Sequence, residues 1–259
     1  MQDLSARLGH RRFFYSKVEE IKMNFLNAFI EDCKYYDLDK IELKNILKYV
    51  DVKNKTILDV GTGIGRLAFP LAKSAKKVIA LDKDKRFRPY FKKHKKTNLK
   101  FVNKNAESYL KNKKGFDIVL LAWPTFDFKM INSIKNSMNK ESKLIFITCD
   151  NNSDYETIPD KLGVLKKAAF NKDVKNKDKI LKKLPKMFKV IIKKKLKTDY
   201  EYPYKKTAFR IIKSGLKLWF GIKLNKIDEI KLINLINKHK RGSKMIFKEK
   251  LYFYVLKLK

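Results

Sequence analysis

The sequence predicts an α/β fold in which most strands lie parallel in a single sheet. Short apolar runs rich in β-branched residues recur along the chain, and segments with a helical spacing of apolar residues separate them. The run Phe116–Ala122 is apolar after Asp117, which is typical of a central parallel strand covered on both faces. Hydrophobic residues make up 44% of the 259-residue chain, so a folded protein with a sizeable core is expected.

The stretch 55–72 is the most informative part of the chain. An apolar run, Thr56-Ile57-Leu58, leads into glycines at every second position, 61, 63 and 65, and then into the start of a helix. Such glycines allow positive φ and leave no Cβ in the way of a ligand, and the following helix directs unpaired N–H groups toward it. The dinucleotide fingerprint G-x-G-x-x-G would need glycine where Arg66 stands, so the spacing argues against NAD.

The pattern Asp59-x-Gly61-x-Gly63-x-Gly65 resembles motif I of class I S-adenosylmethionine-dependent methyltransferases. In that family an acid two residues before the first glycine helps to hold the amino-acid part of the methyl donor. The resemblance implies that this part of the donor site is formed by Asp59, Gly61, Thr62, Gly63 and Gly65.

The resemblance continues at the ends of the next two strands. Asp82 ends the run Val78-Ile79-Ala80-Leu81, where the family has an acid that binds both ribose hydroxyls. Asn105-Ala106 follows the third strand and is similar to the adenine-binding segment, which is usually Asp-Ala. With Asn105 in place of the acid, the contact to the adenine amino group would come from an amide oxygen. S-adenosylmethionine is therefore the implied cofactor.

The family resemblance also implies the architecture. We expect a Rossmann-like three-layer sandwich with a seven-stranded, mostly parallel sheet in which strand seven is antiparallel. Residues 1–54 would form an N-terminal helical cap, and residues 55–259 the methyltransferase domain, with a helical insertion at about residues 200–242. Individual elements are expected as helices near 16–30, 41–49, 66–75, 83–96 and 227–238, a sixth strand at 189–197 and a seventh at 251–256.

The acceptor is expected beside the loop after the fourth strand, Trp123-Pro124-Thr125, because ligands lie outside the carboxyl ends of parallel strands. Relatives that methylate exocyclic amines of bases have an Asn- or Asp-Pro-Pro-Tyr tetrad here, and this chain has only the proline. Thr148-Cys149 resembles the Thr-Cys of RNA 5-methylcytosine methyltransferases, but the second motif of those enzymes, Asp-x-Pro-Cys, is not matched at 122–125. We therefore expect Cys149 to be a buried structural thiol, and no residue is named as catalytic.

The charge leaves the acceptor class open. The chain has 63 Lys and Arg against 27 Asp and Glu, a formal net charge of +36. This surplus favours RNA as a partner, or it reflects the lysine-rich usage of an AT-rich genome. A small-molecule acceptor is expected first, because the layout after strand six resembles that of the ubiquinone-biosynthesis type and no RNA-binding module is recognisable. RNA methylation and a non-catalytic donor-binding scaffold are the alternatives.

Location and other partners follow from simpler features. No apolar segment is long enough to span a membrane, and the first residues lack a signal-peptide pattern, so a cytoplasmic protein is expected. The basic segment 211–224 could lie on a membrane surface or pack into the core. The two cysteines show no metal-binding or redox spacing, and no metal site is expected.

Overall fold

The computed structural model describes residues 25–111, 113–124, 127–164 and 171–259. Its helices are α1 (Phe25–Cys33), α2 (Ile41–Tyr49), α3 (Ala68–Leu71), the 3-10 helix η2 (Lys85–Phe87), α4 (Arg88–Lys93), α5 (Ala106–Leu110), α6 (Phe128–Ser137), α7 (Ile158–Lys161), α8 (Asn171–Met187), α9 (Lys205–Phe220) and α10 (Lys226–Lys238). Its strands are β1 (Thr56–Val60), β2 (Lys77–Asp82), β3 (Leu99–Asn103), β4 (Phe116–Ala122), β5 (Met138–Cys149), β6 (Phe188–Tyr202), β7 (Lys240–Arg241) and β8 (Lys244–Leu258).

Within these described ranges the strands form one eight-stranded sheet in the order β3-β2-β1-β4-β5-β8-β6, with the two-residue β7 paired to β8. β1 to β5 pair in parallel, and β8 runs antiparallel to both of its neighbours, β5 and β6. The expected mostly parallel sheet with an antiparallel last strand is confirmed, and the short β7 is an addition that the sequence did not predict. This order places the carboxyl ends of β1, β2 and β4 along one edge.

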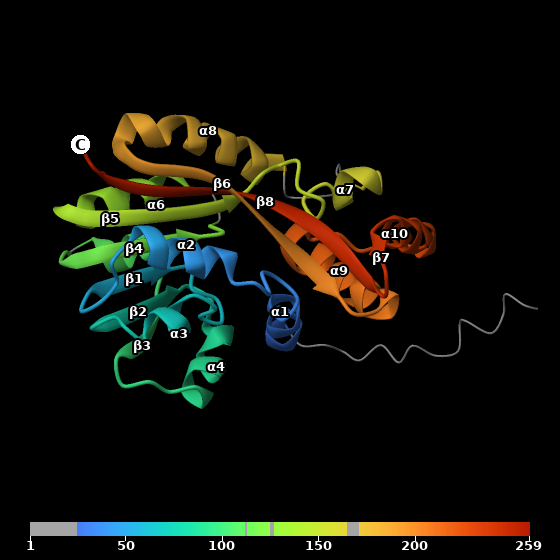
Figure 1. The fold of residues 1–259 in the computed structure, drawn as a ribbon, viewed down its shortest axis with the longest axis horizontal. Coiled ribbons are helices and arrows are strands. Elements are labelled where there is room, and N and C mark those ends of the chain that lie inside the picture. The colour runs from blue at the N-terminus through green and yellow to red at the C-terminus, as the bar shows by residue number, and fades with distance from the viewer. Residues whose placement is uncertain (1–24, 112, 125–126, 165–170) are drawn as a thin grey trace, which may run out of the picture.

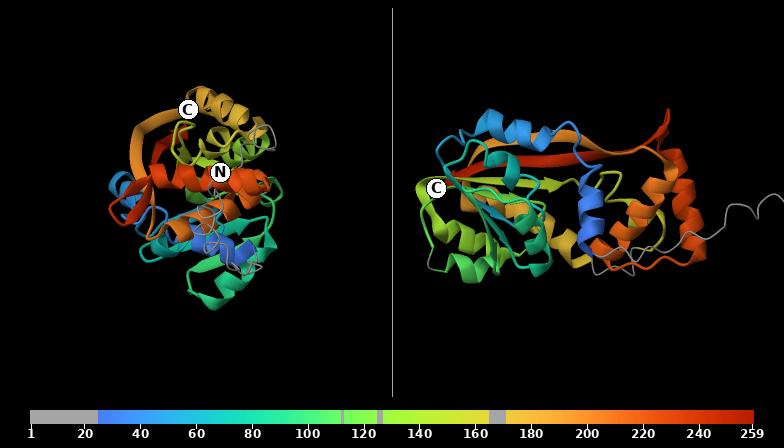
Figure 2. Two further views of the ribbon diagram at one scale, coloured as in Figure 1. Left: turned by 90° about the vertical axis from the view of Figure 1, so that its right-hand side faces the viewer. Right: turned by 90° about the horizontal axis from the view of Figure 1, so that it is seen from below.

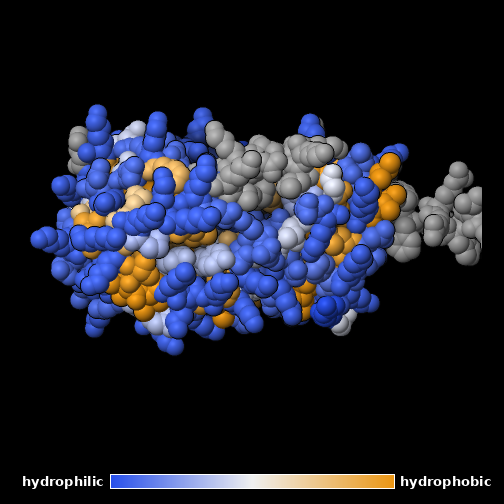
Figure 3. Space-filling view, turned by 90° about the horizontal axis from the view of Figure 1, so that it is seen from above, coloured by the Kyte–Doolittle hydropathy of each residue, from blue (hydrophilic) through white to orange (hydrophobic). Residues whose placement is uncertain are grey.

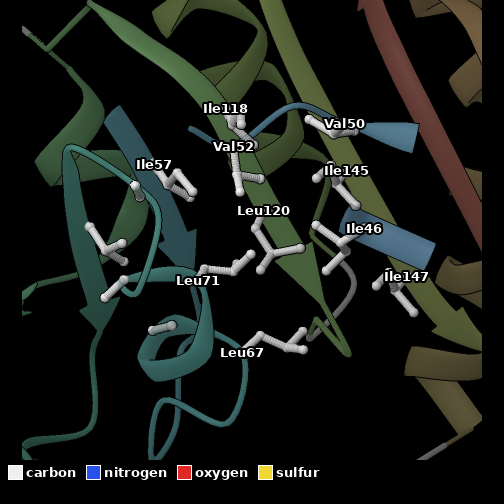
Figure 4. Packing of buried hydrophobic residues seen from close by; sticks show 14 of the residues in the cluster. Ile46, Val50, Val52, Ile57, Leu67, Leu71, Ile118, Leu120, Ile145 and Ile147 are labelled. Carbon is white, nitrogen blue, oxygen red and sulfur yellow. The ribbon is translucent and has the colours of Figure 1, made fainter. Parts of the chain in front are cut away.

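Apolar residues cover both faces of the sheet and create the expected three layers. On one face, α2 and α3 pack against the central strands through residues such as Ile46 and Leu71, which surround Ile57, Leu120 and Ile145 (Figure 4). On the other face, α5, α6 and α8 contribute a second cluster. Alternating side chains of β1 explain the arrangement, because they point to opposite faces of the sheet.

A second lobe extends beyond the sheet. β6 and β8 are 15 residues long each, and their distal halves project past the other strands together with α7, α9 and α10 (Figure 1). A third apolar cluster fills this lobe, with Tyr202, Ile212, Leu216, Ile236 and Phe247 among its buried members. Helix α1 lies at the junction of the lobe and the sheet, where it contacts both α9 and η2 (Figure 2).

Several element boundaries differ from the sequence prediction. The helix expected at 66–75 is regular only over Ala68–Leu71, because the turns that carry Gly63 and Gly65 reach into its start. The basic helix expected at 83–96 is shorter, with η2 followed by α4. β6 continues to Tyr202, where pairing with Met245 of β8 extends it past the predicted end. The first part of the helix expected near 16–30 lies outside the described residues, as does the rest of 1–24.

The surface is more cationic than the composition alone suggests. Hydrophilic side chains cover most of the face in Figure 3, with small hydrophobic patches among them. Among the residues that the structure describes, seven acids are buried: Asp32, Asp37, Glu42, Asp59, Asp150, Asp228 and Glu249. Lys177 is the one buried basic residue in the part of the chain that the structure describes. Folding therefore removes acids from the surface and leaves the lysines on it.

The segment expected either on a membrane or in the core is α9. Its apolar residues Ile211, Ile212, Leu216 and Phe220 are buried in the lobe, so core packing explains its pattern. Among the described helices, none has the length and apolar character needed to cross a bilayer.

Candidate functional site

The glycine loop joins β1 to α3 with all of its glycines in the left-handed region, at φ values of 73° for Gly61, 56° for Gly63 and 77° for Gly65. The N–H groups of Gly61 and Thr62 donate to the carbonyl of Leu81 at 2.8 and 3.1 Å, which ties the loop to the end of β2. A Cβ at Gly61 would meet no heavy atom within 4 Å. The loop therefore leaves open space at Gly61, as a ligand cradle requires, whereas Phe29 lies against Gly63 and Phe69 and Phe91 lie against Gly65.

Asp82 lies at the end of β2 and faces this loop. Its Oδ2 accepts a hydrogen bond from the Gly63 N–H at 2.9 Å, and its Oδ1 accepts one from the Asp84 N–H at 2.9 Å. Burial raises the pKa of the Asp82 carboxyl, and these two N–H groups act in the opposite direction. Each carboxylate oxygen has a second lone pair, so the group could still accept hydrogen bonds from two hydroxyls.

Asp59, the last acid of β1, is buried beneath the loop. The Thr62 hydroxyl donates to its Oδ2 at 2.7 Å. Burial raises the pKa of Asp59 to about 6, although the hydrogen bond from Thr62 lowers it. Asp59 and Thr62 thus form a polar floor under the glycine loop.

The third strand contributes to the same edge. Asn103 ends β3 and donates from Nδ2 to the carbonyl oxygens of Asp82 and Lys83, at 3.0 and 2.9 Å. Asn105 caps α5, with its Oδ1 accepting from the Glu107 N–H at 2.9 Å. The Asn105 amide oxygen is therefore already engaged once, and it retains one lone pair for another donor. Ala106 is the first residue of α5.

Trp123 follows β4 in an unusual conformation, with φ at 54°. A bulky residue in the left-handed region is strained by roughly 1–3 kcal/mol and persists only where its surroundings fix it. Here the Trp123 N–H donates to the Ile147 carbonyl at 2.9 Å, and its Nε1 donates to Glu42 Oε1 at 2.8 Å. Pro124 continues the loop, and Thr125 lies outside the described residues.

Glu42 connects this loop to the glycine loop. It is fully buried on α2 and accepts hydrogen bonds from Trp123 Nε1, from Arg66 Nη2 at 2.6 Å, and from the Tyr36 hydroxyl. Burial alone would lower the pKa of Arg66, but the adjacent Glu42 carboxylate raises it above the ordinary value. The Arg66 guanidinium also lies 4.8 Å from the Tyr36 ring centroid. One buried carboxylate therefore links α2 to both loops.

Helix α1 covers the glycine loop from the side of the lobe. The Phe29 ring lies so close that a Cβ at Gly63 would come within 2.9 Å of it. Phe29 and Phe25 pack against Phe87, with ring centroids 4.8 and 5.5 Å apart. At its other end, Glu31 forms an ion pair with Arg210 of α9. Helix α1 therefore lies between the glycine loop and the lobe and contacts both.

This arrangement, with a glycine loop after β1, an acid after β2 and a reversed last strand, is matched by a known family. A family model described as a methyltransferase domain matches residues 51–215, which is more than half of the chain. The chain belongs to this family. It is a class I S-adenosylmethionine-dependent methyltransferase.

Individual relatives of this methyltransferase are distant or partial. A protein of Anaeromyxobacter dehalogenans assigned as a type II methyltransferase has a TM-score of 0.58 at 13% identity, covering 83% of this chain and 94% of that one. The YcgJ protein of Bacillus subtilis has a TM-score of 0.54 at 15% identity, covering 84% and 98%. At these identities the likeness concerns the fold.

One sequence relative is closer but short. A protein of Methanosphaera stadtmanae assigned as ribosomal RNA small subunit methyltransferase A is 42% identical over 76 residues. The match covers 27% of the methyltransferase described here and 28% of that protein.

The structure brings the expected donor residues Asp59, Gly61, Thr62, Gly63, Gly65 and Asp82 to one edge, with Asn105 and Ala106 after β3, the neighbour of β2, and Trp123 and Pro124 after β4, the neighbour of β1. Sequence reasoning missed Phe29, Tyr36 and Glu42, which come from the part of the chain before β1. No pattern in the sequence connects them to the loops, because their contacts span 24 residues from Glu42 to Arg66 and 81 residues from Glu42 to Trp123.

Cys149 is buried at the end of β5, as expected. Burial raises the pKa of its thiol well above the ordinary value, so the group is neutral and unsuited to nucleophilic attack. Lys177 Nζ lies 3.2 Å from the Cys149 Sγ, and 3.9 Å from a carboxylate oxygen of Glu156. The contact between the buried side chains of Cys149 and Lys177 therefore belongs to the packing of α8 against β5.

Replacing Gly63 with alanine should weaken donor binding and destabilise the fold. The substitution places a side chain at φ 56° and brings its Cβ to 2.9 Å from the Phe29 ring. We expect a loss of about 1–2 kcal/mol in the free energy of unfolding, measured by urea denaturation. The matched control is Gly163→Ala, at φ 72° with no heavy atom within 4 Å of the added Cβ. Equal effects of the two variants on donor affinity would contradict a special role for the loop.

Asp32, which lies on α1 at the edge of the lobe, should make the free energy of unfolding depend on pH. Its Oδ1 is buried and has no hydrogen-bond partner among the described residues. Burial raises the pKa of Asp32 from 3.8 to about 7, so the folded chain holds this proton more tightly than the unfolded chain. The contribution of Asp32 to stability therefore falls as pH rises from about 4 to about 7. Asp32→Asn should gain in stability relative to the unmodified protein between pH 5 and pH 8 in urea denaturation. A pH-independent difference would contradict this.

Proposed function

We propose that this methyltransferase binds S-adenosylmethionine along the edge formed by β1, β2 and β3 and transfers its methyl group to a small-molecule acceptor beside Trp123. The observation that carries the donor assignment is the pairing of the glycine loop with Asp82, whose Oδ2 accepts from the Gly63 N–H at 2.9 Å. A loop with this backbone and an acid at the end of the next strand suit a ligand that carries both an amino acid and a ribose.

Each donor residue has a role that its position supports. Asp59 and Thr62 would lie beneath the amino-acid part, and the open side of Gly61 would admit it. Asp82 would accept hydrogen bonds from the ribose hydroxyls, and Asn105 and Ala106 would lie beside the adenine. Phe29 lies over Gly63, so its ring would contact the amino-acid part or turn aside to admit it.

The donor, when bound, supplies an electrophilic methyl group on a sulfonium. The chain would contribute mainly by aligning the acceptor, because Glu42, the buried carboxylate next to Trp123, already accepts from three donors. A carboxylate held in this way positions Arg66 and Trp123 and is poorly suited to remove a proton. We therefore name no general base.

A small acceptor is favoured by the aromatic packing beside the Trp123 loop. Tyr36 packs edge-to-face on Trp123, with ring centroids 5.2 Å apart, and Tyr200 lies 4.8 Å from Tyr36. Trp123 also packs against the apolar cluster of the second lobe. An acceptor that reaches Trp123 would lie among these packed side chains, an arrangement suited to a compact molecule.

RNA is the second candidate acceptor. The partial likeness to the protein assigned as a ribosomal RNA methyltransferase favours it, at 42% identity over 76 residues. The cationic surface, from which seven acids are withdrawn by burial, favours it as well.

Transfer of labelled methyl groups from S-adenosylmethionine in a cell extract tests both candidates. Products are separated into small-molecule, RNA and protein fractions, with Asp82→Ala as the inactive control. We expect label in the small-molecule fraction. Nuclease-sensitive label in RNA would replace the first candidate by the second, and no label in any fraction would indicate a non-catalytic donor-binding protein.

A further inference from the structure

A groove of about 570 Å³ lies beside the glycine loop, and Asp82 is not among the residues that line it. Its walls come from α1, from the loop residues 64–66, and from α4 with the segment that follows it. The groove is large enough for one nucleotide unit, and no residue of the proposed donor site except Gly65 lines it. It is therefore a separate cavity that shares one wall with the donor loop.

The charged side chains that line this groove are all basic. They are Lys34 just after α1, Arg66 from the loop, and Lys95 and Lys96 after α4. Arg66 is held by Glu42 at 2.6 Å, but Lys34, Lys95 and Lys96 form no ion pair with any acid of the described ranges. Glu31 on α1 is paired with Arg210, although the charge of Lys34 also lowers the pKa of Glu31. Three ammonium groups that lie around one cavity without a direct ion pair produce a field that attracts an anion.

Aromatic rings lie beside these lysines. Tyr90 and His94 line the groove, with ring centroids 4.4 Å apart and an interplanar angle of 37°. Tyr90 is half-buried and His94 is exposed. Phe69 packs edge-to-face against Tyr90, with ring centroids 6.0 Å apart. A partly exposed, supported ring next to cations is the combination that stacks a base while its phosphate is neutralised.

We propose that this groove binds a nucleotide unit, with its phosphate on Lys34, Lys95 and Lys96 and its base stacked on Tyr90. The ligand is either a free nucleotide or one unit of a single-stranded RNA. This inference goes beyond the proposed methyl transfer, because it requires neither the donor nor a particular acceptor. It also assigns a role to a small part of the lysine excess that composition alone leaves unexplained.

Binding is tested with two probes on the full chain: AMP by calorimetry, and a fluorescein-labelled 12-nucleotide oligo(A) RNA by anisotropy. The variant is Lys95→Gln with Lys96→Gln. The control is Lys113→Gln with Lys114→Gln, an equally exposed adjacent pair that removes the same charge elsewhere. We expect at least about a tenfold loss of affinity in the first variant and less than about twofold in the control. For RNA, the slope of log affinity against log salt should fall by about 2 in the first variant only.

Tyr90→Leu tests the stacking and should weaken the affinity for both probes by about tenfold. Thermal unfolding measured in parallel confirms that the variant folds.

Binding of AMP and RNA with equal affinity supports a free nucleotide as the ligand, and much tighter RNA binding supports one unit of an RNA chain. Absence of binding for both probes, or equal losses in the two lysine pairs, overturns the proposal. S-adenosylmethionine affinity should stay unchanged in all three variants. A parallel loss of donor affinity would show that the groove is part of the donor site, which also overturns the proposal without affecting the proposed function.

Discussion

Replacing Asp82 with alanine should weaken S-adenosylmethionine binding by about 30- to 150-fold, which corresponds to about 2–3 kcal/mol. The substitution removes the proposed acceptor for the two ribose hydroxyls. It also frees the N–H groups of Gly63 and Asp84, which the carboxylate now holds at 2.9 Å each, so the glycine loop loses one of its links to β2 and keeps the two bonds from Gly61 and Thr62 to the Leu81 carbonyl. Calorimetric titration of the donor measures the effect directly.

Asp82→Asn separates these two contributions. The amide oxygen can still accept from one of the N–H groups, so the loop should keep part of its geometry, while the charge that strengthens the ribose hydrogen bonds is lost. We expect a loss intermediate between the unmodified protein and Asp82→Ala. Asp51→Asn, an exposed acid outside the site, controls for the change in net charge. Unchanged donor affinity in Asp82→Ala would show that the donor assignment is wrong.

The positions of the residues in the proposed donor site could be predicted from the sequence because they depend on local patterns. The conformation of Gly61, Gly63 and Gly65 follows from their spacing after a strand, and Asp82 ends a strand that must lie beside the first. Parallel pairing then brings these groups to one edge with no further information. The fold was predictable for the same reason, since each strand and most helices carry their own periodic signal.

The position of the acceptor loop after β4 was predicted from the sequence, but the contacts that hold this loop could not be predicted in this way. Glu42 lies on α2, and the spacing of apolar residues in this segment predicts only which face of the helix is buried. From the sequence alone, Glu42 is indistinguishable from an ordinary polar residue on the exposed face of a helix. Its partners are set by the docking of α2 against the sheet through Ile46, which is a tertiary event. The left-handed backbone conformation of Trp123 could not be predicted either, because no glycine or asparagine stands at this position to indicate a positive φ. The length of β6 also depends on pairing with β8 rather than on its own lysine-rich sequence.

Replacing Glu42 with alanine should be the most destabilising change in this region. The fully buried carboxylate accepts from Arg66, Trp123 and Tyr36, and its removal leaves these donors without their partner in a site from which water is largely excluded. Breaking a buried ion pair by removing one partner costs about 3–5 kcal/mol. Because the Arg66 side chain is 25% exposed and keeps Asp37 at 3.7 Å, we expect about 2–3 kcal/mol here. For a chain of this size that lowers the melting temperature by about 4–12 °C.

Comparison of Glu42→Ala with Glu42→Gln separates a purely structural role of Glu42 from a role in positioning the acceptor loop. Glu42→Gln retains a side-chain oxygen for Trp123 Nε1 but loses the charge opposite Arg66, so it should recover part of the stability and hold the loop in place. If Glu42 positions Trp123 for the acceptor, methyl transfer by Glu42→Gln should be close to that of the unmodified protein, and transfer by Glu42→Ala should fall at temperatures where the fold is intact. Donor affinity should change less than methyl transfer in both variants, because the Asp82 contacts do not involve Glu42 and Arg66, which follows the glycine loop, keeps Asp37 at 3.7 Å. Full transfer activity in folded Glu42→Ala would mean that the strained Trp123 conformation is maintained by the Ile147 carbonyl alone and that Glu42 serves only the packing of α2.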